Sequence, residues 1–249
     1  MKNVSFKSFL VVLFFCSFAF GQQNESIPKS AMILETQAVT PNRKMVLWML
    51  NPLKHPYENQ ESDFYACPDE TRGSYYKGVA HVSLIDTTTD KLINTVEVKY
   101  DDNDKSPDEI DIPYAIRGGY YYTVSDSDKK KESKPRIMEM KDYNGDGKAL
   151  EFALFDKEAC QGLSTTLIGY SEKQDKVVQY PIKLKTGDKT ETVYWIDLLF
   201  LEKPVQNGFW KYQIDYRGRG GSLDKYEIRY DKEGESFGGI LTSETPKND

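Results

Sequence analysis

The chain has 249 residues and a formal net charge of −6 at pH 7, with 39% hydrophobic and 13% aromatic residues. That length allows one sizeable β domain or two small ones. The acidic balance argues against nucleic acid or an anionic membrane as a partner, because both attract clustered positive charge. With two histidines in the whole chain, the usual general-base and zinc-ligand roles have few candidates.

The first 21 residues are organised like a cleaved signal peptide. A basic start over residues 1–7 is followed by an apolar core of about 12 residues and a small-residue cleavage pattern that ends at Gly21. A helix that spans a bilayer needs about 20 apolar residues, so we expect cleavage after Gly21 and no transmembrane segment in the mature chain. Cleavage changes the formal charge from −6 to −8, because 33 basic residues fall to 31 while 39 acids remain. The sequence therefore predicts a secreted or periplasmic protein of the cell envelope, similar to exported bacterial proteins.

The mature chain is expected to form a β-rich domain over 31–242, after a flexible lead-in over 22–30 and before a loose tail over 243–249. Short alternating or apolar runs separated by polar turns recur along it, without a convincing helical period over ten residues. The predicted strands cover 44–50, 78–86, 92–98, 120–124, 136–141, 150–155, 166–170, 177–184, 192–201, 208–216 and 226–230. The predicted fold class is all-β, an antiparallel β-sandwich built of hairpins, with two small β subdomains as the alternative.

Cys67 and Cys160 are the two cysteines that remain after signal-peptide cleavage. In an oxidising compartment an even pair most simply forms one disulfide, which would close a loop of about 93 residues and restrict the unfolded chain. A metal-binding or catalytic thiol is the alternative, but neither a CxxC spacing nor a nearby histidine supports it. We therefore expect a bridge that ties the early part of the fold to its middle.

The sharpest local motif is the acidic segment 142–148, Asp-Tyr-Asn-Gly-Asp-Gly-Lys. Oxygen ligands at alternate positions converge on one hard cation where the backbone turns sharply, and a glycine at the sixth position permits that turn. Asp142, Asn144 and Asp146 would give side-chain oxygens, and Lys148 would give a backbone carbonyl. The motif resembles the calcium loops of EF-hand, dockerin and FG-GAP or VCBS repeat proteins, and this resemblance implies a bound calcium ion.

The motif departs from those families after its first seven residues. An EF-hand loop has a bidentate Glu at position 12, where this chain has Ala153, and an FG-GAP loop has an acid at position nine, where it has Leu150. Glu151 is the nearest substitute, and it would need a slightly longer loop to reach the ion. The predicted flanking strands match the FG-GAP type, and the resemblance covers about 14 residues. The alternative to calcium is an acidic Asn-Gly hairpin turn.

No catalytic constellation stands out in the sequence. His55 lies in a predicted surface loop and His81 on the more exposed side of its strand, so we expect both to be solvated. A glycosidase needs only two carboxylates about 5 to 9 Å apart, but the sequence does not single out a pair. Tryptophans such as Trp195 and Trp210 suit a sugar-binding platform, yet we expect them in the core of a β protein.

Together these observations predict a secreted, non-catalytic β domain that binds an extracellular glycan or protein through its aromatic and acidic loops. Calcium is the expected cofactor of the loop at 142–148. The alternatives are a secreted carbohydrate-active hydrolase that uses a carboxylate pair, and a structural protein of the envelope.

Overall fold

The computed structural model describes residues 26–55, 71–72, 75–100, 107–112, 114–117, 120–123, 136–158 and 162–245. The predicted signal peptide and the predicted Cys67–Cys160 disulfide lie outside the described residues. None of the helical segments in the described ranges is long and apolar enough to cross a membrane.

Nearly all of the regular structure is β-strand, which confirms the predicted fold class. The elements are β1 (Ala31–Thr40), β2 (Arg43–Leu50), β3 (Leu53–His55), β4 (Thr71–Arg72), β5 (Tyr75–Asp86), β6 (Leu92–Glu97), β7 (Glu109–Ile112), β8 (Tyr114–Arg117), β9 (Tyr120–Thr123), β10 (Glu151–Glu158), β11 (Gly162–Ser171), β12 (Lys176–Gln179), β13 (Ile182–Thr186), β14 (Lys189–Val193), β15 (Ile196–Asp197), β16 (Phe209–Asp215), the short 3-10 turn η3 (Arg217–Arg219), β17 (Leu223–Asp231) and β18 (Ser236–Glu244).

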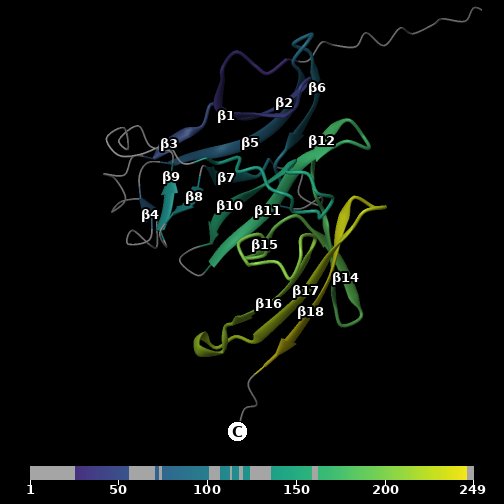
Figure 1. Cartoon of the computed structure of the whole chain (residues 1–249). Coiled ribbons are helices and arrows are strands. Elements are labelled where there is room, and N and C mark those ends of the chain that lie inside the picture. The colour runs from purple at the N-terminus through teal and green to yellow at the C-terminus, as the bar shows by residue number, and fades with distance from the viewer. Residues whose placement is uncertain are drawn as a thin grey trace, which may run out of the picture.

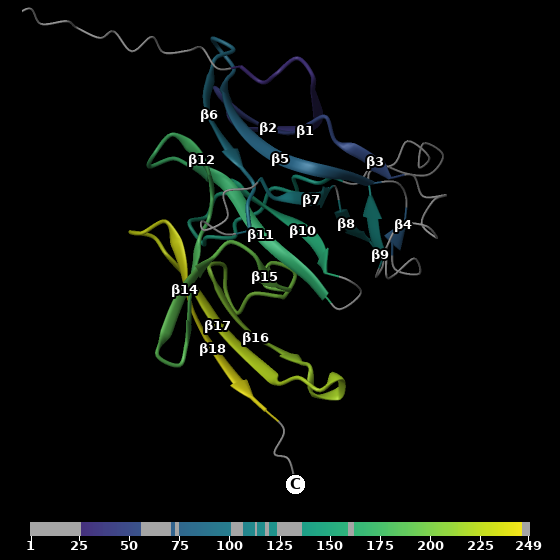
Figure 2. The ribbon, with the colours of Figure 1, turned by 180° about the vertical axis from the view of Figure 1, so that it is seen from behind.

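Three larger sheets follow one another through the molecule (Figure 1). The N-terminal sheet runs β1-β2-β5-β3, with β6 and β7 also paired to β5, and the middle sheet runs β10-β11-β12, with β15 paired to β11. The C-terminal sheet has the order β14-β13-β18-β17-β16, and β4, β9 and β8 form a small fourth sheet. Figure 2 shows the middle sheet between the other two from the opposite side. The pairs are antiparallel except for β13 with β18 and β4 with β9, which are parallel.

The middle sheet contributes to two hydrophobic cores, because successive side chains of a strand point to opposite faces. Phe152 and Leu154 pack in the first core with residues of the N-terminal sheet, such as Leu47 and Val82. Ala153, between them in β10, packs in the second core, which also contains Trp210 and Phe237 of the C-terminal sheet. The prediction that Leu150, Phe152 and Leu154 share one face is therefore confirmed.

Buried polar side chains of the middle sheet form hydrogen bonds to neighbouring strands and segments. The Thr165 hydroxyl donates to the carbonyl of Ile196 at 2.9 Å, which fixes β15 beside β11. The Gln179 amide donates to the Thr166 hydroxyl at 3.0 Å and to the carbonyl of Lys99 at 2.9 Å. These pairs remove the cost of burying polar groups between two sheets.

Several strand predictions hold and others are wrong. The predicted hairpin at 78–86 and 92–98 corresponds to β5 and β6, and the strand at 44–50 corresponds to β2. The segment 136–141 is irregular apart from one bridge between Lys141 and Glu151, so the predicted strand there is wrong. His55 lies in β3 and pairs with Tyr75, where a loop was expected.

The predicted strand at 177–184 is two strands of different sheets. It breaks at Tyr180 and Pro181, because proline lacks the N–H needed to continue a ladder, and β13 then joins the C-terminal sheet. The predicted strand at 192–201 reduces to the end of β14 and the two residues of β15. At the C-terminus, β18 continues to Glu244, two residues beyond the predicted end of the domain.

Candidate functional site

The acidic loop 142–147 joins the irregular segment to β10 and folds around its own side chains. Each bond runs from a backbone N–H to an oxygen earlier in the loop: Gly145 (2.7 Å) and Gly147 (3.1 Å) donate to Asp142, Asp146 donates to Asn144 (2.8 Å), and Lys148 donates to Asp146 (2.9 Å). Such side-chain to backbone bonds are typical of Asx turns. The loop therefore has the sharp turn that the motif predicts.

The loop packs backbone to backbone against the turn before β16. Gly145 and Gly208 have φ values of 80° and 79°. A Cβ atom on Gly145 would lie 2.6 Å from the carbonyl oxygen of Asn207, and one on Gly208 would lie 2.6 Å from that of Asn144. The Asn207 amide also donates to Asp142 at 3.0 Å. Glycine is needed at both contacts, because any side chain would separate the two turns.

Glu151 lies behind the loop with its side chain fully buried, at 0% relative exposure. Its carboxylate accepts hydrogen bonds from the Tyr143 N–H at 3.1 Å and from the Asn144 amide at 2.9 Å. Burial and the charges of Asp146 and Asp142 raise the pKa of Glu151 while these hydrogen bonds lower it, and together they bring it to about 8. At neutral pH this carboxyl group therefore holds a proton, unless a cation is bound beside it.

The side chains of the predicted calcium site carry suitable oxygen atoms, but the structure does not bring these oxygens together around one point. The Asn144 amide nitrogen faces Glu151 at 2.9 Å and Asp146 at 3.4 Å, so a donor group separates the two carboxylates. Within the described ranges, no three His, Cys, Asp or Glu side chains are placed to hold one metal ion. A calcium ion at this place would have to displace the Asn144 amide from between the two carboxylates.

The second candidate site is the face of the C-terminal sheet that points away from the second core, called the outer face below. Alternation along the strands places these solvent-accessible residues on it: Lys183, Lys185, Thr190, Thr192, Lys211, Gln213, Asp215, Lys225, Glu227, Arg229, Asp231, Gly238, Ile240, Thr242 and Glu244. Five of them are basic and four are acidic. Lys211, Lys225 and Arg229 each pair with an acid on this face, whereas Lys183 and Lys185 have no ion pair with the described residues. The outer face therefore carries both charges, and its unpaired cations lie on β13.

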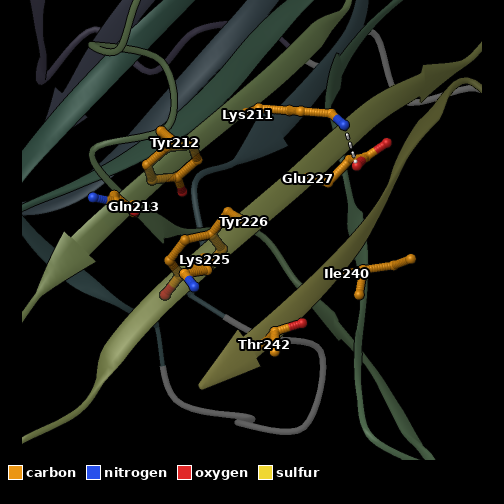
Figure 3. Close-up of a pocket in the computed structure, with 8 residues that line it drawn as sticks. All are labelled: Lys211, Tyr212, Gln213, Lys225, Tyr226, Glu227, Ile240 and Thr242. Atoms are coloured by element: carbon orange, nitrogen blue, oxygen red, sulfur yellow. Dashed lines mark ion pairs between the residues drawn. The ribbon is translucent and has the colours of Figure 1, made fainter. Parts of the chain in front are cut away.

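An open pocket of about 480 Å³ lies on this sheet, lined by Lys211, Tyr212, Gln213, Lys225, Tyr226, Glu227, Ile240 and Thr242. Figure 3 shows the Lys211 side chain reaching Glu227, at 2.8 Å between Nζ and Oε2, with Ile240 and Thr242 on the next strand. The lining contains a single carboxylate and no histidine, cysteine or serine. It offers binding groups but neither a carboxylate pair nor a nucleophile with its base.

Trp195 belongs to the first core and Trp210 to the second, as predicted, whereas Trp48 is buried outside both cores, against His81. Trp48, Trp195 and Trp210 have relative exposures of 6%, 8% and 1%, and Phe209 has 7%. The Tyr212 hydroxyl donates to the carbonyl of Asp197 at 2.9 Å. None of these rings is free to form a sugar platform, so a contact surface built on them is excluded.

Of the two histidines, His81 is the one whose side chain the structure describes. His81 stacks on Trp48, with ring centroids 4.2 Å apart, and its Nε2 lies 3.7 Å from a carboxylate oxygen of Glu97. Burial lowers the pKa of His81, which differs from the solvated histidine that we expected. The imidazole acts as part of the packing of the N-terminal sheet.

The sequence analysis did not identify the residues of the outer face. Ile182 and Leu184 alternate with Lys183 and Lys185, which is the signal of a half-exposed strand. The sequence does not show that these lysines lie beside β18, because their position depends on the parallel pairing of β13 with a strand about 50 residues later. No family model, curated protein or solved structure matches this chain, so the residues themselves carry the functional argument.

Proposed function

We propose that this protein is exported and acts outside the cytoplasm as a non-catalytic binding protein, with an extracellular glycan as its ligand. The observation that carries the proposal is the uncovered outer face of the C-terminal sheet with its open pocket. Exposed charged and hydroxyl groups over a flat sheet suit a ligand with many polar groups. The single carboxylate of the lining supports binding over glycoside hydrolysis, which needs two.

A screen of soluble glycans tests this function. The protein should bind at least one glycan class in interferometry and release no reducing sugar from it. Release of product would support the hydrolase alternative instead. Absence of binding to every glycan, together with stable self-association or copurified envelope proteins, would support a structural role.

We also propose calcium binding by the loop 142–147, as a second property. Glu151 supports it, because this buried carboxylate lies close to Asp142 and Asp146, whose charges raise its pKa. A divalent cation would neutralise these groups and let Glu151 ionise. Binding would require the Asn144 amide to give up its contacts with Glu151 and Asp146. A thermal melt in chelator and in calcium tests the proposal.

A further inference from the structure

Gly238 and Gly239 lie next to each other in β18, but only one of them is explained by packing. A Cβ atom on Gly239 would lie 2.9 Å from Ile228 and 3.1 Å from Leu184, so the second core leaves no room for a side chain. A Cβ atom on Gly238 would meet nothing within 4 Å, and its φ is not positive. A glycine in the interior of a strand costs stability and often marks a place where a ligand approaches the backbone.

Gly238 begins a strip of small or uncharged side chains along β18, which continues with Ile240 and Thr242. Lys183 and Lys185 flank this strip on β13, and Arg229, Glu227 and Lys225 flank it on β17. We call these eight residues the basic lane, because four of the five charged ones are basic. From the spacing of strands and residues, it is about 10 Å wide and about 13 Å long. Ile240 is 55% exposed, so the floor is apolar and open to solvent.

The two lysines of the lane on β13 have no role within the described fold, whereas Lys225 on β17 pairs with Glu244. Lys183 and Lys185 are both exposed, and neither forms an ion pair or hydrogen bond with the described residues. Two like charges on one face of a strand repel each other. Protection of a sheet edge does not explain them, because β13 lies between β14 and β18. Their charge is therefore available to a partner.

Arg229 is held in position on the opposite side of the lane. Its guanidinium carbon lies 3.4 Å from the centroid of the Phe209 ring, and its Nη2 lies 3.4 Å from Glu227. Stacking on an aromatic ring orients the planar group and leaves other donors free. A cation that is ordered in advance loses less entropy when an anion binds.

We propose that the basic lane binds one chain of an acidic polysaccharide, with uronic acid carboxylates paired to Lys183, Lys185 and Arg229 across the strip. The apolar faces of the sugar rings lie on Gly238 and Ile240, and the Thr242 hydroxyl bonds to sugar hydroxyls. This inference rests on the proposed glycan-binding function, and it adds the ligand class and the residues that select it.

A polysaccharide fits the lane better than an acidic peptide or a nucleic acid. The strand β18 is paired on both sides, so its backbone groups cannot add a peptide strand. The lane is short and lies on a chain with a net charge of −6. A dense polyanion such as DNA would meet repulsion beyond it. A uronate polymer has fewer charges per length, and its hydroxyl groups match the polar side chains of the outer face.

Biolayer interferometry with immobilised polygalacturonate tests the inference directly. The protein should bind polygalacturonate, and raising the salt concentration should weaken binding because paired charges are screened. Neutral dextran and polyglutamate serve as comparisons, and both should bind at least about ten-fold more weakly. A ten-fold change corresponds to about 1.4 kcal/mol.

Two variants separate charge from shape. Lys183→Glu with Lys185→Glu reverses two charges and should weaken binding at least about ten-fold. Lys176→Glu with Lys189→Glu is the matched control, because it changes the net charge equally at exposed positions outside the lane. Gly238→Leu keeps every charge and places a side chain in open space. The fold should therefore survive, while contact between the sugar ring and the floor is lost.

The outcomes distinguish this inference from the proposed function. Unchanged binding in both lane variants would overturn the assignment of the site. Binding of polyglutamate or DNA as tight as that of polygalacturonate would overturn the assignment to a polysaccharide. If a neutral glycan binds and polygalacturonate does not, the acidic ligand is wrong but the glycan-binding function stands. If no glycan binds, both fail.

Discussion

The acidic loop 142–147 and the basic lane are two charged regions of this protein that differ in how their charges are satisfied. In the loop, the oxygens of Asp142, Asn144 and Asp146 accept bonds from backbone N–H groups, and Glu151 is buried behind them. In the lane, Lys183 and Lys185 are exposed to solvent. A closed polar network stabilises the fold, whereas exposed and unpaired charges are available for binding.

The comparison also shows that a sequence motif and a binding surface need not coincide. The loop has the recognisable spacing, and its side chains bond to its own backbone. The lane has no motif, because it is assembled from three strands. The following predictions test whether the polar groups of the loop are bonded within the fold and whether the lysines of the lane are available to a ligand. They run from the largest expected effect to the smallest.

The largest effect is expected from Glu151 as the pH rises from acidic to weakly alkaline. Its pKa rises from 4.5 to about 8 on folding, so the unfolded chain releases this proton first as the pH rises. The free energy of unfolding should therefore fall by roughly 3 to 5 kcal/mol as the pH rises from 4.5 to about 8. Glu151→Gln cannot titrate and should lose this pH dependence.

Denaturant unfolding of both proteins at pH 5 and pH 9 measures the effect. Glu139→Gln is the control, because Glu139 is exposed and should follow the wild type. Parallel stability curves for the wild type and Glu151→Gln would show that the buried carboxyl group does not hold its proton.

Because of the contact between the two turns, substitution of Gly145 should destabilise the fold far more than substitution of Gly147. Both have positive φ, at 80° and 88°, but a Cβ atom on Gly147 would meet nothing within 4 Å. Gly147→Ala should cost about 1 kcal/mol of backbone strain. Gly145→Ala should cost about 2 to 4 kcal/mol, because the turn at Asn207 must also move. Equal losses in urea unfolding would mean that the turns are not packed together.

Calcium should have a moderate effect if the loop binds it. At a dissociation constant of about 0.1 mM, a ten-fold excess adds about 1.4 kcal/mol, which should raise the melting temperature by about 3 to 6 °C. Asp146→Ala should abolish this shift. Asn144→Asp should enlarge it, since it replaces the amide donor with a carboxylate. Identical melting temperatures in chelator and in calcium for all three proteins would show that the loop is an acidic turn that does not bind calcium.

The smallest effect on stability is expected in the lane. Lys183→Ala and Lys185→Ala remove exposed side chains without partners among the described residues, so unfolding free energies should stay within about 0.5 kcal/mol of the wild type. A loss of more than about 1 kcal/mol in either variant would indicate a structural role and weaken the argument for an open surface.

The sequence predicts local features of this fold better than distant ones. The turn of the loop is recognisable because its Asx and glycine residues act within a few positions. The alternation of Leu150, Phe152 and Leu154 also identifies one buried face of β10 correctly. Its second buried face was not predicted, because Ala153 is small and gives no strong signal for a core on both sides of a sheet.

The lane could not be predicted for a related reason. The change of sheet at Pro181 looks like continuous alternation in the sequence, and the parallel pairing of β13 with β18 has no local signature. The doublet Gly238-Gly239 suggests a turn when it is read alone. Only the register shows that Gly239 faces a core while Gly238 faces solvent.

The most direct test of the account is lysine acetylation with and without polygalacturonate, followed by mass spectrometry. Lys183 and Lys185 should react readily in the free protein and become protected several-fold in the complex. Lys148, which pairs with Glu172 beside the acidic loop, should react equally in both conditions. Protection of Lys148 with unchanged reactivity of Lys183 and Lys185 would contradict the account, because it would place binding at the loop instead of the lane.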